Sequence, residues 1–220
     1  MQKAIRYLSR FIWSQSQLKS QYLNKFYVAI GIIILAAGSS SRLGQSKQLI
    51  QLNGKSLLQH AANVALNSEA DIVITMMGSN AQLHKSEIES LNVEIIENKG
   101  WQLGMGNSLK VGLNHLLTSK TNIQAAIIMV CDQPYLTTSH LNTLINTYKK
   151  EKPEIVASTY NLIKGVPALF AASLFPKLLK LGDTEGARKI IEKHVGSIVL
   201  VPFEKGEIDI DTPEDLERLG

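Results

Sequence analysis

The stretch VAIGIIILAAGSSSRLG, residues 28–44, decides the fold. Its first part, Val28–Ala36, is an unbroken apolar run, which is typical of a strand buried on both faces of a parallel sheet. The run passes directly into alanine, glycine and serine, whose small side chains let a ligand come close to the backbone. This order predicts a central strand that ends in a ligand-binding loop, and it favours an α/β fold.

Apolar runs alternate with amphipathic stretches along the rest of the chain, as in an α/β protein with a mostly parallel sheet. Further strands are expected at residues 71–76, 93–96, 125–130, 155–158, 168–171, 198–201 and 208–211. Helices are expected at 56–67, 81–90, 107–117, 137–149, 173–180 and 184–193, with a last short helix begun by Thr212 and Pro213. No repeat or low-complexity linker interrupts the pattern, so residues 28–220 are expected to form one domain.

Residues 1–27 differ from this domain in charge. They contain basic residues and no acid, so the net charge of +4 belongs to this leader and the remainder is nearly neutral. A neutral domain disfavours a nucleic-acid surface, which requires clustered Lys and Arg. The leader fits a disordered extension, a start assigned too far upstream, or a basic amphipathic helix that contacts a membrane or a partner. No apolar run reaches the ~20 residues of a membrane span, so stable membrane insertion is not expected.

A single cysteine, Cys131, excludes an internal disulfide and agrees with a cytoplasmic location. No histidine arrangement accompanies it, so we expect a small buried residue and not a nucleophile. The histidines show no metal-ligand spacing and are expected on helix surfaces, at positions 60, 84, 115, 140 and 194.

The loop after the first strand has the composition of a phosphate site. Backbone N–H groups and serine hydroxyls around Gly38 and Ser39 are natural donors to phosphate oxygens. Arg42 adds a planar fork and Lys47 a point charge. The alternative is a flexible turn with solvated cations. The spacing contains neither the Gly-x-Gly-x-x-Gly pattern of dinucleotide-binding proteins nor the Gly-Lys-Ser/Thr ending of a P-loop.

Carboxylates follow two of the expected strands. Asp132 comes directly after the run 125–130, and Asp209 and Asp211 alternate with isoleucines in the run 208–211. Mg²⁺ typically binds one or two carboxylates together with substrate phosphates, so these three residues are candidate Mg²⁺ ligands. Asp132 is equally suited to cap the turn before Pro134, and the other two to approach a helix N-terminus.

The segment Gly104-Met-Gly-Asn-Ser108 precedes an expected helix. Its two glycines let backbone groups reach the edge of a base, and Asn107 or Ser108 can supply hydrogen bonds.

Together these motifs resemble the MobA-like nucleotidyltransferases, and within them the molybdenum cofactor cytidylyltransferases. The resemblance rests on Leu35-Ala-Ala-Gly-x-Ser-x-Arg-x-Gly-x-x-Lys47, Gly104-Met-Gly-x-Ser108, Asp132-Gln-Pro134 and Asp209-Ile-Asp-Thr-Pro-Glu-Asp-Leu216. It runs from about residue 28 to the C-terminus. Leu43, Ser46 and Gly106 replace the family's usual Met, Pro and Ala, which leaves the choice of base less secure than the reaction.

The resemblance implies a Rossmann-like three-layer sandwich that binds NTP with Mg²⁺ and transfers NMP to a phosphorylated acceptor, releasing pyrophosphate. It implies catalytic roles for Arg42, Lys47 and Asp132, and Mg²⁺ binding by Asp132, Asp211 and Asp209. It implies nucleotide binding by Leu35, Ala36, Ala37, Gly38, Ser39, Arg42, Lys47, Gly104, Gly106 and Ser108. Gly165, Pro167 and Arg188 are placed by the same resemblance near the acceptor.

The expected reaction is transfer of CMP from CTP to molybdopterin, since Ala37 points to cytidine where guanylyl relatives tend to carry glycine. A molybdoenzyme or a maturation factor is an expected partner. Alternatives are a guanylyl- or sugar-phosphate nucleotidyltransferase and a non-catalytic factor that binds a pterin cofactor.

Overall fold

In the computed structural model, seven strands among the described residues (28–40, 43–119, 122–210 and 215) form one sheet in the order β5-β4-β1-β6-β8-β7-β9. The strands are β1 (Ala29–Ala36), β4 (Ile72–Met77), β5 (Glu94–Glu97), β6 (Ile123–Val130), β7 (Ile155–Tyr160), β8 (Ile163–Ala171) and β9 (Ile198–Pro202). The pairs β5-β4, β4-β1, β1-β6 and β7-β9 are parallel, whereas β8 runs antiparallel to both neighbours. The expected mostly parallel sheet is confirmed.

Strand β1 lies inside this sheet, between β4 and β6, and all eight of its residues are buried. Ile33 pairs with Ile74 of β4 on one side and with Ile128 of β6 on the other. Because both edges of β1 are paired and both faces are covered, the unbroken apolar run has no polar position. The loop that follows is therefore fixed to a strand buried in the core.

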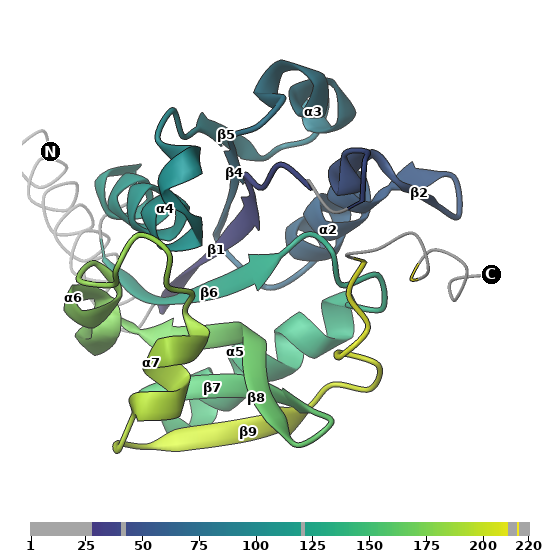
Figure 1. The fold of residues 1–220 in the computed structure, drawn as a ribbon. Coiled ribbons are helices and arrows are strands. Elements are labelled where there is room, and N and C mark those ends of the chain that lie inside the picture. Colours follow the sequence, from purple (N-terminus) through teal and green to yellow (C-terminus); the bar gives the residue numbers. More distant parts are fainter. Residues whose placement is uncertain (1–27, 41–42, 120–121, 211–214, 216–220) are drawn as a thin grey trace, which may run out of the picture.

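The helices cover both faces of the sheet in three layers (Figure 1). Helices α2 (Leu57–Leu66), α3 (Ala81–Ile88) and α5 (Thr138–Glu151) pack on the face that contains Ile30, Ile32 and Ile34. Helices α4 (Met105–Ser119), α6 (Phe175–Leu178) and α7 (Arg188–Lys193) pack on the opposite face, which contains Ile33 and Leu35. Because side chains alternate along β1, this strand contributes to two separate hydrophobic cores, one on each face of the sheet. No described helix is long and apolar enough to span a membrane.

Strand β8 corrects one expectation. Gly165 and Pro167 lie within this strand, not in a loop before it. Ala157 pairs with Ala168 while Ser158 pairs with Gly165, so Val166 and Pro167 form a bulge. A bulge accommodates proline because that position has no ladder partner for the missing N–H. This irregularity breaks the alternation that would have marked one long strand.

Other differences concern the ends of elements and short elements. The stretch 173–180 divides into a 3₁₀ turn, Ala172–Leu174, and the single turn of α6. Helix α7 begins only at Arg188 because the preceding residues form a turn against α4. Residues 208–210 form no strand, and Asp211, Thr212 and Pro213 lie outside the described residues. A small hairpin of β2 (Gln51–Leu52) and β3 (Lys55–Ser56) was not expected, although Asn53-Gly54 is a strong hairpin signal.

Candidate functional site

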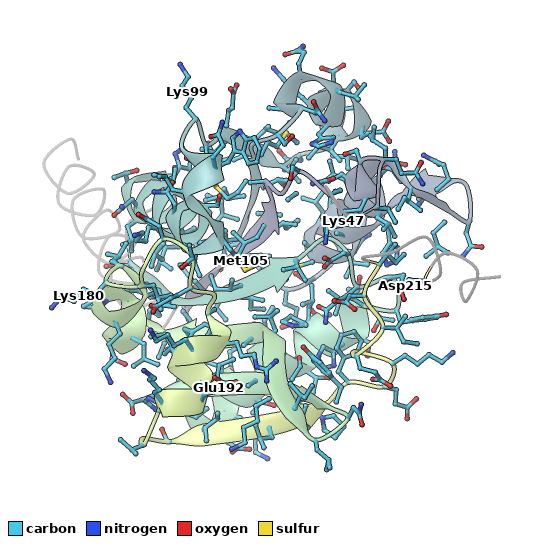
Figure 2. All side chains as sticks on the ribbon, viewed as in Figure 1. Lys47, Lys99, Met105, Lys180, Glu192 and Asp215 are labelled. Carbon is cyan, nitrogen blue, oxygen red and sulfur yellow. The ribbon has the colours of Figure 1, made fainter. Side chains whose placement is uncertain are left out.

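A cavity of about 250 Å³ opens at the carboxyl ends of β1 and β6. Figure 2 labels Lys47 and Met105, which line this cavity from the segment after β1 and from the start of α4. The full lining comprises Leu35, Ala36, Ala37, Gly38, Ser39, Lys47, Gln48, Trp101, Gln102, Gly104, Met105, Ser108, Val130, Cys131 and Asp132. The structure therefore brings the loop after β1, the segment before α4 and Asp132 together, as the sequence motifs predict for a nucleotide site.

Gln48 holds the loop after β1 in shape. Its side chain is fully buried, and its Nε2 donates to the carbonyl oxygens of Ala36 (3.0 Å) and Gly38 (2.9 Å). Its Oε1 accepts from the hydroxyls of Ser40 (3.2 Å) and Ser46 (2.8 Å). The role of this residue could not be predicted from the sequence, because nothing distinguishes a glutamine beside Lys47 from a solvated side chain.

Lys47 and Asp132 form an ion pair at the floor of the cavity, with side chains 18% and 12% exposed. Asp132 Oδ2 accepts from Lys47 Nζ. Asp132 Oδ1 is buried and has no hydrogen-bond partner among the described residues. A buried carboxylate oxygen without a donor needs a ligand, and a divalent cation or a donor from a bound substrate meets this need. Asp132 therefore fits the Mg²⁺ that the family resemblance implies.

The described residues contain no group of three or more His, Cys, Asp or Glu side chains that would hold a metal alone. Mg²⁺ typically binds one or two carboxylates of a protein, and substrate phosphates and waters complete its coordination. Of the other expected Mg²⁺ ligands, Asp211 lies outside the described residues. Arg42, which is expected to bind the phosphates, also lies outside them. Asp209 is exposed, and the next residue, Ile210, donates its backbone N–H to the Asp132 carbonyl oxygen at 3.2 Å. This bond places Ile210 beside Asp132.

The other wall of the cavity comes from the 3₁₀ turn Trp101–Leu103 and the start of α4. Trp101 packs against Gly78, where a Cβ atom would come within 2.5 Å of the Trp101 Cβ. Gly104 has a φ of 127° and also approaches the Asp183 carbonyl oxygen, which a Cβ would meet at 2.6 Å. Gly106 does not line the cavity. A Cβ there would meet the Gly182 carbonyl oxygen at 2.2 Å, so this glycine serves the packing of α4 on the turn after Leu181.

The residues expected near the acceptor do not line this cavity. Gly165 packs against the Tyr160 hydroxyl, which would lie 2.2 Å from a Cβ. The Pro167 carbonyl oxygen accepts from Ser158 Oγ at 2.6 Å. Arg188 is exposed and pairs with Glu192 on α7, at 2.7 Å between Nε and Oε1. Gly165–Pro167 is nevertheless linked to the cavity through Gln133, next to Asp132.

Gln133 Nε2 donates to the carbonyl oxygens of Val166 (3.2 Å) and Gly206 (2.9 Å). Its buried amide thus ties the bulge of β8 and the segment before Asp209 to the end of β6. In the sequence this glutamine is only part of the motif Asp132-Gln-Pro134, and nothing in its neighbourhood indicates a role.

The Cys131 thiol is not suited to act as a nucleophile in the cavity. Burial raises the pKa of Cys131 to about 12, so the thiol stays protonated. The expectation that all histidines lie on helix surfaces is wrong for His84 and His140, which are buried on the inner faces of α3 and α5. Burial lowers the pKa of His140 to about 4, and its Nε2 lies 2.7 Å from Ser158 Oγ. The helical spacing of the sequence alone did not show that each of these two histidines lies on the buried face of its helix.

Comparisons with known proteins agree with this geometry. The MobA-like NTP transferase domain matches residues 32–198. Purine catabolism protein PucB of Bacillus subtilis is 28% identical over 200 residues, covering 85% of this chain and 94% of that protein. Molybdenum cofactor cytidylyltransferase of Escherichia coli is 25% identical over 189 residues, covering 85% and 93%. The crystal structure of Rv0371c from Mycobacterium tuberculosis has a TM-score of 0.74 at 24% identity, covering 87% and 97%, and shows a likeness of fold.

Proposed function

The chain belongs to the MobA-like NTP transferase family, and we propose that it transfers CMP from CTP to the terminal phosphate of molybdopterin. One observation carries the proposal: the loop after β1, Lys47 and a buried carboxylate with an unpaired oxygen, Asp132 Oδ1, line one cavity. A triphosphate and its cation supply the charges that complete such a site.

In the proposed reaction, a terminal phosphate oxygen of the acceptor attacks the α-phosphorus of CTP. The new P–O bond forms as the bond to the bridging oxygen breaks, and pyrophosphate leaves with the bonding electrons. We propose direct transfer, with no covalent intermediate on the protein. Positioning and charge neutralisation then supply the acceleration.

The loop after β1 presents backbone N–H groups to the phosphates, and Lys47 offsets the charge on the departing pyrophosphate. We assign a similar role to Arg42. Asp132 would hold Mg²⁺, with Asp211 or Asp209 as a second ligand. Bound Mg²⁺ neutralises phosphate charge and orients the phosphate oxygens. Lys47 has a further role before substrate binds, because its ammonium group neutralises the Asp132 carboxylate.

We propose the remaining assignments on the same basis. Residues 28–220 form the catalytic domain, and the leader 1–27 is a separate segment of a cytoplasmic protein. Gly165, Pro167 and Arg188 contact the acceptor and not the nucleotide, because they lie outside the cavity. Val166, between the first two, is linked to the end of β6 through Gln133. Cytosine is favoured over guanine by Ala37 in the cavity lining, where guanylyl relatives tend to carry glycine.

Pyrophosphate release from each of the four nucleoside triphosphates, with and without molybdenum cofactor, tests the proposal. We expect release from CTP with the cofactor, and no release without an acceptor. Release from GTP with the cofactor would identify a guanylyltransferase, and release with a sugar phosphate a different acceptor. Cofactor binding without release from any nucleotide would show a non-catalytic binding factor.

A further inference from the structure

A chain of hydrogen bonds runs behind the cavity from the turn after Leu181 to Ser108. Asp183 Oδ1 accepts from Lys110 Nζ (2.7 Å) and from Asn107 Nδ2 (3.2 Å). Asn98 Nδ2 donates to Asn107 Oδ1 and to Ser108 Oγ, each at 3.0 Å. Asn98 and Ser108 are 4% and 2% exposed. The chain thus joins a charged surface residue to a buried hydroxyl in the cavity lining.

The direction of every bond in this chain is fixed from both ends. At one end, the Gly100 backbone N–H donates to Asn98 Oδ1 at 2.9 Å, so the Asn98 amide must direct its NH₂ group toward Asn107 and Ser108. At the other end, hydrogen bonds from Lys110 and Asn107 lower the pKa of Asp183. Its ionised carboxylate can only accept, which orients the Asn107 amide in the same sense.

Ser108 Oγ consequently accepts from Asn98 and retains its own hydrogen. No described residue accepts that hydrogen, and the side chain faces the cavity lining. We infer that Asn98 is a positioning residue that fixes the Ser108 hydroxyl as a hydrogen-bond donor to an acceptor atom of the base. Cytosine offers such atoms at O2 and N3. The inference rests on the proposed function, since it assumes that a nucleotide base occupies this wall of the cavity.

The chain can be reversed at the cost of one bond outside the cavity: Lys110 Nζ loses its acceptor at 183 and keeps the Leu181 carbonyl oxygen at 3.0 Å. In the double variant Asn98→Asp with Asp183→Asn, the carboxylate at 98 accepts from Gly100, Asn107 and Ser108, and the amide at 183 donates to Asn107. Ser108 then gives its hydrogen to residue 98 and presents a lone pair to the base. Asp183→Asn alone is the matched control, because its amide oxygen accepts from Asn107 and the original direction is kept. Ser108→Ala removes the donor.

Calorimetric titration of the full-length protein with Mg·CTP tests the inference, with Mg·tripolyphosphate as a probe that lacks a base. We expect the double variant to bind CTP about ten- to a hundredfold more weakly than Asp183→Asn, because an acceptor would face an acceptor. Tripolyphosphate binding should be unchanged, which a general disruption of the site would not allow. Ser108→Ala should bind CTP about tenfold more weakly than the wild type.

Equal CTP affinity of the double variant and the control would overturn the role of Asn98, as would parallel losses for CTP and tripolyphosphate. If the double variant does not fold, wild-type affinity of Ser108→Ala for CTP overturns the inference by itself. Failure of the proposed function appears separately, as tighter binding of another nucleotide by the wild-type protein. The same comparison of variants is then made with that nucleotide.

Discussion

Replacement of Gln48 by methionine tests whether one buried amide determines the shape of the phosphate loop. Methionine nearly conserves the volume but removes both donors, which leaves the carbonyl oxygens of Ala36 and Gly38 without their Nε2 partner. Each unpaired buried acceptor costs about 1–3 kcal/mol, and the second one is only partly buried, so we expect a loss of about 2–4 kcal/mol. For a domain of this size, that loss lowers Tm by roughly 5–15 °C.

Thermal unfolding followed by circular dichroism measures this effect, and calorimetry measures the affinity for Mg·CTP. Gln51→Met is the matched control, because the Gln51 side chain is exposed and makes a single bond, to the Leu49 carbonyl oxygen. We expect the control to retain the wild-type Tm and Gln48→Met to bind the nucleotide more weakly. If Gln48→Met unfolds within about 1 °C of the control and binds CTP equally well, the loop keeps its shape without the amide and the reasoning is refuted.

Three further predictions concern charge, protonation and the leader. Asp132→Asn should fold normally by circular dichroism yet release pyrophosphate at least about a hundredfold more slowly. An amide is a weak ligand for Mg²⁺, and it no longer neutralises the charge of Lys47. A wild-type rate would mean that Asp132 only caps the turn. Burial lowers the pKa of His140 to about 4, so the unfolded chain binds a proton at a higher pH than the folded protein. The free energy of unfolding should therefore fall by up to about 3 kcal/mol as the pH is lowered from 6.5 to 4. Denaturant titrations of the wild type and of His140→Gln should diverge over this interval, and parallel curves would contradict the assignment. A truncation that begins near Phe26 should keep both Tm and turnover, since the acid-free leader lacks a strand-like run, and a loss of several degrees would show that it packs on the domain.

The central strand and the phosphate loop could be predicted from the sequence because both depend on local order. An apolar run such as Val28–Ala36 can be stable only where both faces are covered, and the small residues after it mark the loop. Asp132 was found for the same reason, since it ends another buried run. These features need no knowledge of which elements become neighbours.

The supporting residues could not be predicted, because their roles depend on contacts between distant segments. Asp183 bonds to α4 across more than 70 positions, and Gln133 to Gly206 likewise. The bulge at Val166 and Pro167 defeats period-2 analysis in the strand where it occurs. His84 and His140 are buried because they lie on the faces of α3 and α5 that pack against the rest of the domain. Which face packs depends on where the sheet lies, and the sequence of each helix alone does not show it.

The contact between the start of α4 and the turn after Leu181 limits how this protein can be redesigned. The main chain at Gly104 and Gly106 packs directly against the main chain of this turn. A Cβ atom at Gly104 would lie 2.6 Å from the Asp183 carbonyl oxygen, and one at Gly106 would lie 2.2 Å from the Gly182 carbonyl oxygen. A mutant library aimed at a new base should leave both glycines untouched, since every other residue there displaces a whole segment. Diversity belongs at Gln102 and Met105, whose exposed side chains line the same cavity and can change in size without moving the backbone.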